Sequence, residues 1–249
     1  MLLDVAAPVV DAINTNGLVI NEKDESTGNY SVKAVTSISQ EPSFKADLIV
    51  VFVKAMYSKS ALDSVKSAIT EDTYIMSVQN GSGHEELLSQ YVSEDHVLIG
   101  TTQHNSAVLA PGVVRHGGSG LTHVGRINGD VTGLDVLAQN FTSCNLETDC
   151  KSDLNQLVWE KLFTNISASV LTGVFKSNLG FISQNPNAWA LCTELIREAV
   201  EVAKADGCNF DFETELEKVR KVSVNSPEGI TSICADLRNG RKTEVDTIS

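Results

Sequence analysis

The chain has 249 residues, 42% of them hydrophobic and 20% charged, which is enough for one large domain or two modest ones with a buried core. The net charge of −13 argues against nucleic acid or an anionic membrane surface as the main partner, and no apolar run approaches the ~18 residues that a bilayer requires. The N-terminus has no basic stretch of the kind that begins a signal peptide. The five cysteines have no paired spacing, which predicts free thiols in a reducing cytoplasm.

The first half of the chain alternates short apolar runs with helical patterns. Residues 47–53 form a continuous run rich in β-branched side chains, which is typical of a parallel strand buried on both faces. The predicted elements are strands at 47–53, 74–78 and 97–101, and helices at 61–69 and 85–88. This strand–helix–strand order predicts an α/β domain of Rossmann type, with a doubly wound sheet.

A glycine run at 117–120 lies between two short alternating segments, 113–116 and 121–125, and predicts a β-hairpin. That hairpin would place His116 opposite His123, but zinc needs three or four ligands, so no metal site is expected. A helix at 133–141 and a strand at 145–148 complete this half.

From residue 153 onward the pattern is helical throughout. Helices are predicted at 154–175, 187–206, 212–222 and 229–237, with Asp153 as the N-cap of the first. We therefore expect a Rossmann-type domain over residues 1–152 and an all-α domain over 153–249. Both ends look cut, because residues 1–4 resemble the end of a second strand and residues 242–249 stop in mid-pattern.

One predicted helix carries a polar stripe. Lys161, Asn165, Ser169 and Thr172 follow one another at helical spacing along one side of the helix at 154–175. Periodicity alone favours a stripe that faces solvent. The alternative is a lysine proton donor in a cleft, with amide and hydroxyl groups that orient a small polar substrate.

The glycine motif that cradles a pyrophosphate, GxGxxG, is absent from the sequence. The glycine pairs at 81–83 and 118–120 lack the third glycine and are interpreted as turns, so the sequence alone does not establish dinucleotide binding. Lys54 and Asn80 nevertheless follow two predicted strands, and ligands of open α/β sheets bind outside such carboxyl ends. Asn80-Gly81 is equally a favourable turn pair.

Several segments, in order, resemble the ketopantoate reductase (2-dehydropantoate 2-reductase) family across nearly the whole chain. They are VKA at 53–55, QNGSGHEE at 79–86, GTTQH at 100–104, PG at 111–112, GLTHVG at 120–125, WEKL at 159–162 with Asn165, and TS at 231–232 with KTEVD at 242–246. Each is weak alone, but the ordered set is specific. The family's first strand, its GxGxxG turn and its final helical stretch have no counterpart, so the chain is expected to be truncated at both ends.

The resemblance implies a reductase that converts 2-dehydropantoate to (R)-pantoate with NADPH, on the route to pantothenate and coenzyme A. It implies Lys161 as the proton donor to the substrate carbonyl. Implied substrate-binding residues are Asn80, Asn165, Ser169 and Ser232, and implied cofactor-binding residues are Lys54, Asn80, Ser106 and Glu244. Ser169 and Gly229 depart from the asparagines that members often carry there.

The choice of cofactor and substrate stays open. NADP is the family's usual cofactor, but Asp4 stands where an NADP-preferring member often shows an arginine, so NAD is possible unless Asp4 only ends a strand. One alternative function is a dehydrogenase of another 2-oxo acid, and another is a catalytically silent truncated homologue. The expected partner is a small 2-oxo acid, with neither nucleic acid nor membrane, and a homodimer is left open.

Overall fold

The computed structural model describes residues 1–248 and divides the chain into two compact units. Unit 1 comprises Met1–Val53, Tyr57–Val78 and Glu85–Ser152. Unit 2 comprises the chain from Asp153 onward together with two short segments of the first half, Lys54–Met56 and Gln79–His84. The sequence does not indicate that these segments leave the first unit.

The central element of unit 1 is a five-stranded sheet. Its strands are β5 (Leu48–Val51), β6 (Tyr74–Ser77), β7 (Val97–Thr102), β10 (Thr122–Gly125) and β11 (Thr148–Cys150). They lie in the order β11-β10-β7-β6-β5. The predicted parallel strands are confirmed, since β5 pairs in parallel with β6 and β6 with β7, whereas β10 runs antiparallel to β7.

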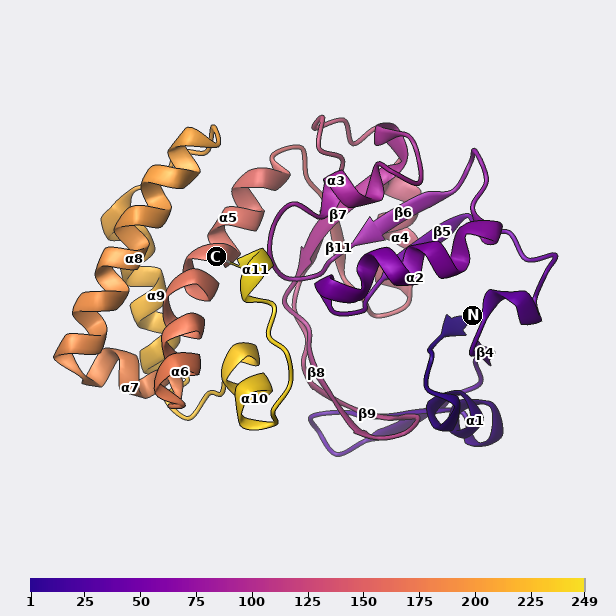
Figure 1. Ribbon diagram of the computed structural model, residues 1–249, viewed down its shortest axis with the longest axis horizontal. Coiled ribbons are helices and arrows are strands. Elements are labelled where there is room, and N and C mark those ends of the chain that lie inside the picture. The colour runs from indigo at the N-terminus through magenta and orange to yellow at the C-terminus, as the bar shows by residue number, and fades with distance from the viewer. Residues whose placement is uncertain (249) are drawn as a thin grey trace. The chain divides into compact units, whose positions relative to one another are not determined.

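Helices cover both faces of this sheet, as a doubly wound fold requires. The helices α2 (Ser58–Val65) and α3 (His84–Leu88) lie in front of the strands in Figure 1, and α4 (Asp135–Ser143) lies behind them. Short 3₁₀ turns occupy Ala55–Tyr57, Lys66–Ala68 and Glu94–His96. Leu137 and Phe141 of α4 pack against the buried Met76, Val78 and Leu98 of the sheet region. This apolar packing keeps the carboxyl ends of β5 and β6 in place.

The predicted hairpin around residues 117–120 is wrong. The hairpin instead joins β8 (Asn105–Ala110) to β9 (Val113–Gly118), whereas β10 belongs to the other sheet. The turn falls at Pro111-Gly112, where Gly112 has a φ of +71° that glycine adopts without strain. As a consequence His116 does not face His123.

The hairpin forms part of a second sheet, with the order β3-β2-β9-β8. Its other strands are β2 (Leu18–Asn21) and β3 (Thr27–Tyr30). The N-terminal residues form a separate parallel pair of β1 (Leu2–Leu3) and β4 (Ala34–Val35), so the expectation of a strand at residues 1–4 is confirmed. The helix α1 (Ala7–Asn16) follows β1 in the chain. A 3₁₀ turn at Ile38–Gln40 follows β4.

Unit 2 contains the helices that the second half predicts, with four differences. Its helices are α5 (Leu154–Thr164), α6 (Val170–Phe175), α7 (Leu179–Gln184), α8 (Pro186–Ala205), α9 (Phe212–Asn225), α10 (Ser232–Arg238) and α11 (Val245–Ile248). The expected single helix at 154–175 contains a π turn at Asn165–Ser169, and neither α7 nor α11 was predicted. Asp153 precedes α5 but its side chain makes no capping hydrogen bond.

The core of unit 2 lies among α5, α7, α8 and α9. Phe163, Ile182, Ile196 and Val219 are at most 1% exposed and form one apolar cluster. All five cysteines are free thiols. Within residues 1–248, no helix combines the length and the apolar character that crossing a membrane requires.

Candidate functional site

Lys161 lies in the last turn of α5, where the helix is partly covered by its surroundings. Burial lowers the pKa of the Lys161 ammonium below its ordinary value of 10.5, because water stabilises the charged form better than a protein interior does. Asn165 follows one turn later and is half-buried. A lysine with a lowered pKa next to an amide can donate a proton to a polar ligand.

The solvent-facing stripe that periodicity favours is wrong. Ser169 is 5% exposed and Thr172 is fully buried, so the polar side of this helix is turned into the protein. The Ser169 hydroxyl lies 3.5 Å from the Asn165 amide oxygen, to which it donates. The Ser169 hydroxyl is therefore directed at the Asn165 side chain.

The π turn at Asn165–Ser169 changes how this polar side is arranged. In a regular α-helix, side chains four residues apart drift by about 40° around the axis. A π turn has more residues per turn, so four residues fall short of a full turn and offset that drift. The Ser167 hydroxyl supports the turn by donating to the Phe163 carbonyl at 2.5 Å. The result is that Lys161, Asn165 and Ser169 line up along one side of the helix.

Two threonines connect this helix to the start of α10. The Thr231 side chain caps α10 by accepting from the Cys234 N–H, and its oxygen lies 2.8 Å from the Thr172 hydroxyl. Thr172 also bonds to the Ser169 carbonyl at 2.9 Å. These contacts fix the first residue of α10, the exposed Ser232, relative to the helix that carries Lys161.

Lys54 and Glu244 are both involved in contacts that hold the segment after β5. The Lys54 Nζ lies 2.5 Å from a carboxylate oxygen of Asp236 and 3.2 Å from the Lys242 carbonyl. The Glu244 carboxylate accepts from the Ala55 N–H at 2.8 Å. Asp236 was missed from sequence, although its position four residues after Ser232 puts both on one side of α10.

Asn80 lies in the turn after β6, and that turn is held at two points. The His84 Nε2 donates to the Asn80 carbonyl at 2.9 Å, and the Ser82 N–H donates to the Thr247 carbonyl at 3.0 Å. Gly81 has a φ of +99°, and a Cβ there would lie 2.2 Å from the Thr247 oxygen. Only glycine fits this turn without a shift of the backbone.

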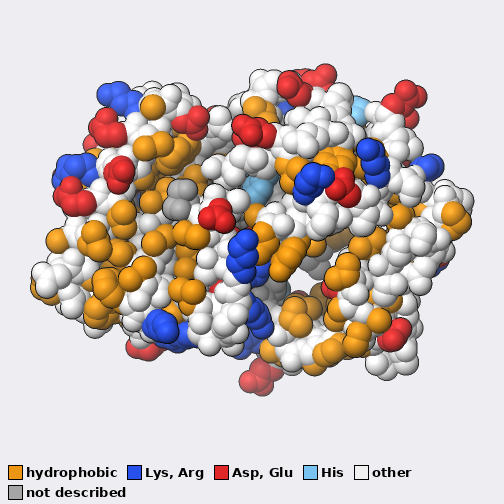
Figure 2. Space-filling view, viewed as in Figure 1, with side chains coloured by type: hydrophobic (Ala, Val, Ile, Leu, Met, Phe, Trp, Pro, Cys, Tyr) orange, Lys and Arg blue, Asp and Glu red, His pale blue; other side chains and the backbone are white. Residues whose placement is uncertain are grey.

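Ser106 belongs to unit 1, where it lies on the exposed strand β8. It lines a cavity of about 780 Å³ whose wall is largely apolar and includes Val50, Phe52 and Met76. Figure 2 shows a hollow edged with hydrophobic side chains between α2 and β9. His116 lines the same cavity, where it contacts His104 at 3.0 Å and Glu22 at 2.7 Å.

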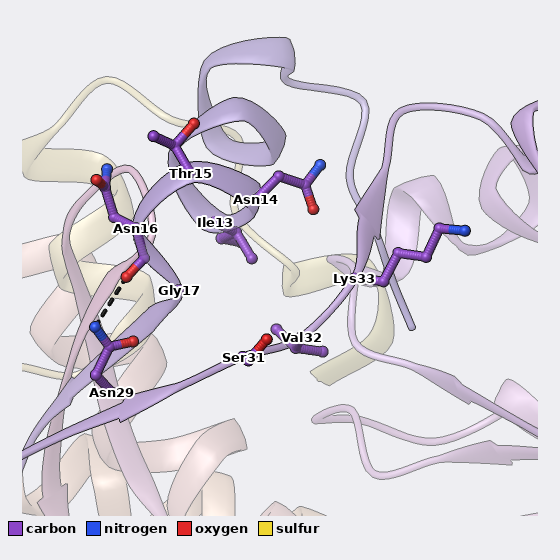
Figure 3. Close-up of a pocket in the computed structure, with 9 residues that line it drawn as sticks. All are labelled: Ile13, Asn14, Thr15, Asn16, Gly17, Asn29, Ser31, Val32 and Lys33. Atoms are coloured by element: carbon purple, nitrogen blue, oxygen red, sulfur yellow. Dashed lines mark hydrogen bonds between the residues drawn. The ribbon is translucent and has the colours of Figure 1, made fainter.

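A second pocket of about 490 Å³ lies in unit 1 at the end of α1 (Figure 3). Asn29 crosses it to donate to the Asn16 carbonyl at 2.9 Å. None of the candidate site residues lines this pocket. Among the described residues, no group of three or more His, Cys, Asp or Glu side chains could hold a metal ion.

Comparison with known proteins decides the family. Residues 1–129 match the model for ketopantoate reductase PanE/ApbA, and residues 153–249 match that for its C-terminal part. The chain is also 31% identical over 215 residues to 2-dehydropantoate 2-reductase of Halobacterium salinarum, covering 85% of this chain and 70% of that one. The chain belongs to the ketopantoate reductase family. This is a family of oxidoreductases.

Other relatives agree with this assignment. The 2-dehydropantoate 2-reductase of Pyrococcus horikoshii is 30% identical over 244 residues, which cover 96% of this chain and 77% of that one. D-mandelate dehydrogenase, solved with NADH and anilino(oxo)acetate, superimposes with a TM-score of 0.88 at 24% identity, over 99% of this chain and 80% of that one. The 2-dehydropantoate 2-reductase of Geobacter metallireducens superimposes with a TM-score of 0.86 at 24% identity, covering 99% and 82%. The two structures show that the fold is that of ketopantoate reductases.

Most of the residues that the family resemblance implies for the site belong to unit 2. They are Lys54, Asn80, Lys161, Asn165, Ser169, Ser232 and Glu244, whereas Ser106 belongs to unit 1. Unit 2 thus combines the lysine whose pKa is lowered with the two loops that follow β5 and β6. Within this unit the second half of the chain supplies the contacts that hold both loops.

Proposed function

We propose that this protein reduces the ketone of 2-dehydropantoate to (R)-pantoate with a nicotinamide cofactor, as a step of pantothenate and coenzyme A biosynthesis. The observation that carries the proposal is Lys161: a lysine whose pKa is lowered by burial, in the last turn of a helix that presents Asn165 next to it. Membership of the ketopantoate reductase family supplies the reaction class.

Lys161 acts in this proposal as the general acid. Reduction of a ketone turns the carbonyl oxygen into an alkoxide, and a proton donor near that oxygen lowers the barrier. Burial brings the pKa of Lys161 closer to the working pH, so its proton is given up more readily than that of an exposed lysine. Asn165 and Ser232 orient the substrate by hydrogen bonds, and Ser169 fixes the Asn165 amide.

The proposed cofactor-binding residues are Lys54, Asn80, Ser106 and Glu244. When bound, a reduced nicotinamide supplies hydride to the carbonyl carbon. Lys54 and Asn80 follow β5 and β6, whose carboxyl ends are where open α/β sheets bind ligands. Ser106 lines a largely apolar cavity, which fits an aromatic ring better than a phosphate. The residues present therefore fit part of a dinucleotide, although the chain has no GxGxxG turn.

A dehydrogenase of another 2-oxo acid is a second candidate, and Ser169 favours it. Members of the family often carry an asparagine at this position, but Ser169 is buried and donates to Asn165. A shorter side chain that does not reach the substrate leaves the substrate's far end less constrained. D-mandelate dehydrogenase, which shares the fold, is an enzyme of this kind by its name.

The test is a set of steady-state rates with NADPH or NADH and a series of 2-oxo acids, together with chiral analysis of the product. We expect the highest kcat/KM for 2-dehydropantoate, with (R)-pantoate as product. A higher kcat/KM for another 2-oxo acid would establish the second candidate. No turnover with any of them would identify a catalytically silent homologue. A homodimer stays a prediction, to be checked by sedimentation of the same sample.

A further inference from the structure

The Lys54 ammonium is held on two sides by the C-terminal part of unit 2. The Asp236 carboxylate lies 2.5 Å from Nζ, and the Lys242 carbonyl lies 3.2 Å from it. An ammonium has three N–H donors. Among the described residues these two acceptors therefore leave one N–H of Lys54, whose side chain is 33% exposed, for a ligand.

Asp236 is itself well anchored. Its side chain is only 11% exposed, and its carbonyl closes the end of α10 by accepting from the Arg241 N–H at 2.8 Å and the Asn239 N–H at 3.1 Å. These contacts fix the backbone of Asp236, and burial restricts the carboxylate that binds Lys54. Charge-assisted hydrogen bonds of this length are among the stronger contacts in proteins.

The pairing also cancels the charge of Lys54. A carboxylate at 2.5 Å leaves little net positive potential beyond the pair. A phosphate is bound best by an unpaired cation or by several donors. A neutral oxygen, such as a ribose hydroxyl or a carboxamide oxygen, needs only one well-directed N–H.

We infer that Asp236 is a positioning residue for Lys54, and that the Lys54–Asp236 pair donates a hydrogen bond to a neutral oxygen of the cofactor rather than to a phosphate. The inference rests on the proposed function, which places Lys54 at the cofactor. It assigns a role to Asp236 that acts entirely through Lys54.

The test is a double-mutant cycle of Asp236→Asn, Lys54→Met and both together. The dissociation constant of NADPH is measured by saturation-transfer NMR, which also reads millimolar affinities, and the unfolding free energy is measured on the same four proteins. We expect each single variant to weaken NADPH binding by about 10-fold, and the double variant to bind no more weakly than Lys54→Met alone. Asp63→Asn, in the exposed Lys59–Asp63 pair, is the matched control and should leave the affinity unchanged.

A second arm varies the salt concentration. The comparison is between the unaltered protein and the double variant, because the pair has no net charge in either. If the pair faces a neutral oxygen, the salt dependence of NADPH affinity is the same in both; if Lys54 faces a phosphate, the double variant makes that dependence shallower and contradicts the inference. Tighter NADPH binding by Asp236→Asn than by the unaltered protein also overturns it. So does a loss of NADPH affinity from Asp236→Asn that is as large in the Lys54→Met background as in the unaltered protein. Coupling in the unfolding free energy without coupling in affinity would show a purely structural pair. No NADPH binding by the unaltered protein would overturn the proposed function and this inference with it.

Discussion

Burial gives Lys161 a lowered pKa, and the same burial costs stability. Because the unfolded chain holds this proton up to the ordinary pKa of 10.5, the charged lysine destabilises the folded state at any pH below its folded pKa. The penalty fades as the pH rises from the lowered value toward 10.5. A group that is useful for proton transfer is thus kept at a cost in folding stability.

Replacement of Lys161 by methionine should therefore stabilise the protein while removing the proton donor. We expect the thermal midpoint of Lys161→Met to exceed that of the unaltered protein by a few degrees at pH 7, with the gap closing as the pH approaches 10.5. Thermal unfolding at pH 7, 8.5 and 10 measures this, with the exposed Lys23→Met as control. A lower midpoint for Lys161→Met at pH 7 would show that the ammonium makes a net stabilising contact.

Asp4 bears on the choice of nicotinamide cofactor. It follows β1, is exposed, and accepts a hydrogen bond from the Ala6 N–H at 2.8 Å, just before α1. An acid at the end of this strand hydrogen-bonds a ribose 2′-hydroxyl and repels a 2′-phosphate. We expect kcat/KM with NADH to be at least equal to that with NADPH, and Asp4→Asn to shift the ratio toward NADPH. A strong NADPH preference in the unaltered protein would mean that Asp4 only ends a strand.

At the scale of elements, the turn after β6 is the feature most sensitive to one added carbon. Gly81 and Gly83 both have positive φ, of +99° and +77°, but only Gly81 lies against the Thr247 carbonyl. We expect Gly83→Ala to cost about 1 kcal/mol of unfolding free energy from backbone strain, and Gly81→Ala to cost about 2–3 kcal/mol because the turn must also move. Denaturant unfolding of the two variants measures the difference in unfolding free energy. Equal costs would show that the backbone at Thr247 moves away from the added carbon without a penalty.

The elements that were predicted correctly are those with a strong local signal. The segment that becomes β5 is a continuous run of apolar residues, and the long α8 keeps a helical period of apolar residues over its length. The hairpin was misplaced because the glycines at 117–120 and the Pro111-Gly112 turn give competing local signals, and only pairing with β2 across the chain separates them.

The sequence motifs name candidate site residues, but they do not predict the contacts that these residues make. The ordered motifs point to Lys161, Asn165 and Ser232, and the Thr172–Thr231 contact fixes the start of α10, where Ser232 lies, against the end of the helix that carries Lys161. The Lys54–Asp236 pair joins residues 182 positions apart, and no periodicity reports such a pair. The π turn was also missed, because a one-residue change of helical register leaves the amphipathic pattern almost unchanged.

At the scale of the whole molecule, the compact units do not follow the order of the chain. Unit 2 takes Lys54–Met56 and Gln79–His84 from the first half, and holds them through Asp236, Glu244 and Thr247. The proposed proton donor and two proposed cofactor contacts therefore belong to one packed body. Stability of this body and geometry of the site depend on the same contacts.

The central claim is that Lys161 protonates the substrate during reduction. The most direct measurement is kcat for NAD(P)H-dependent reduction of 2-dehydropantoate by the unaltered protein and by Lys161→Ala, with cofactor affinity measured on both. We predict a fall in kcat of about 10²–10⁴-fold, the range for loss of a general acid, with nearly unchanged cofactor affinity. A Lys161→Ala variant that retains the kcat of the unaltered protein would contradict the account.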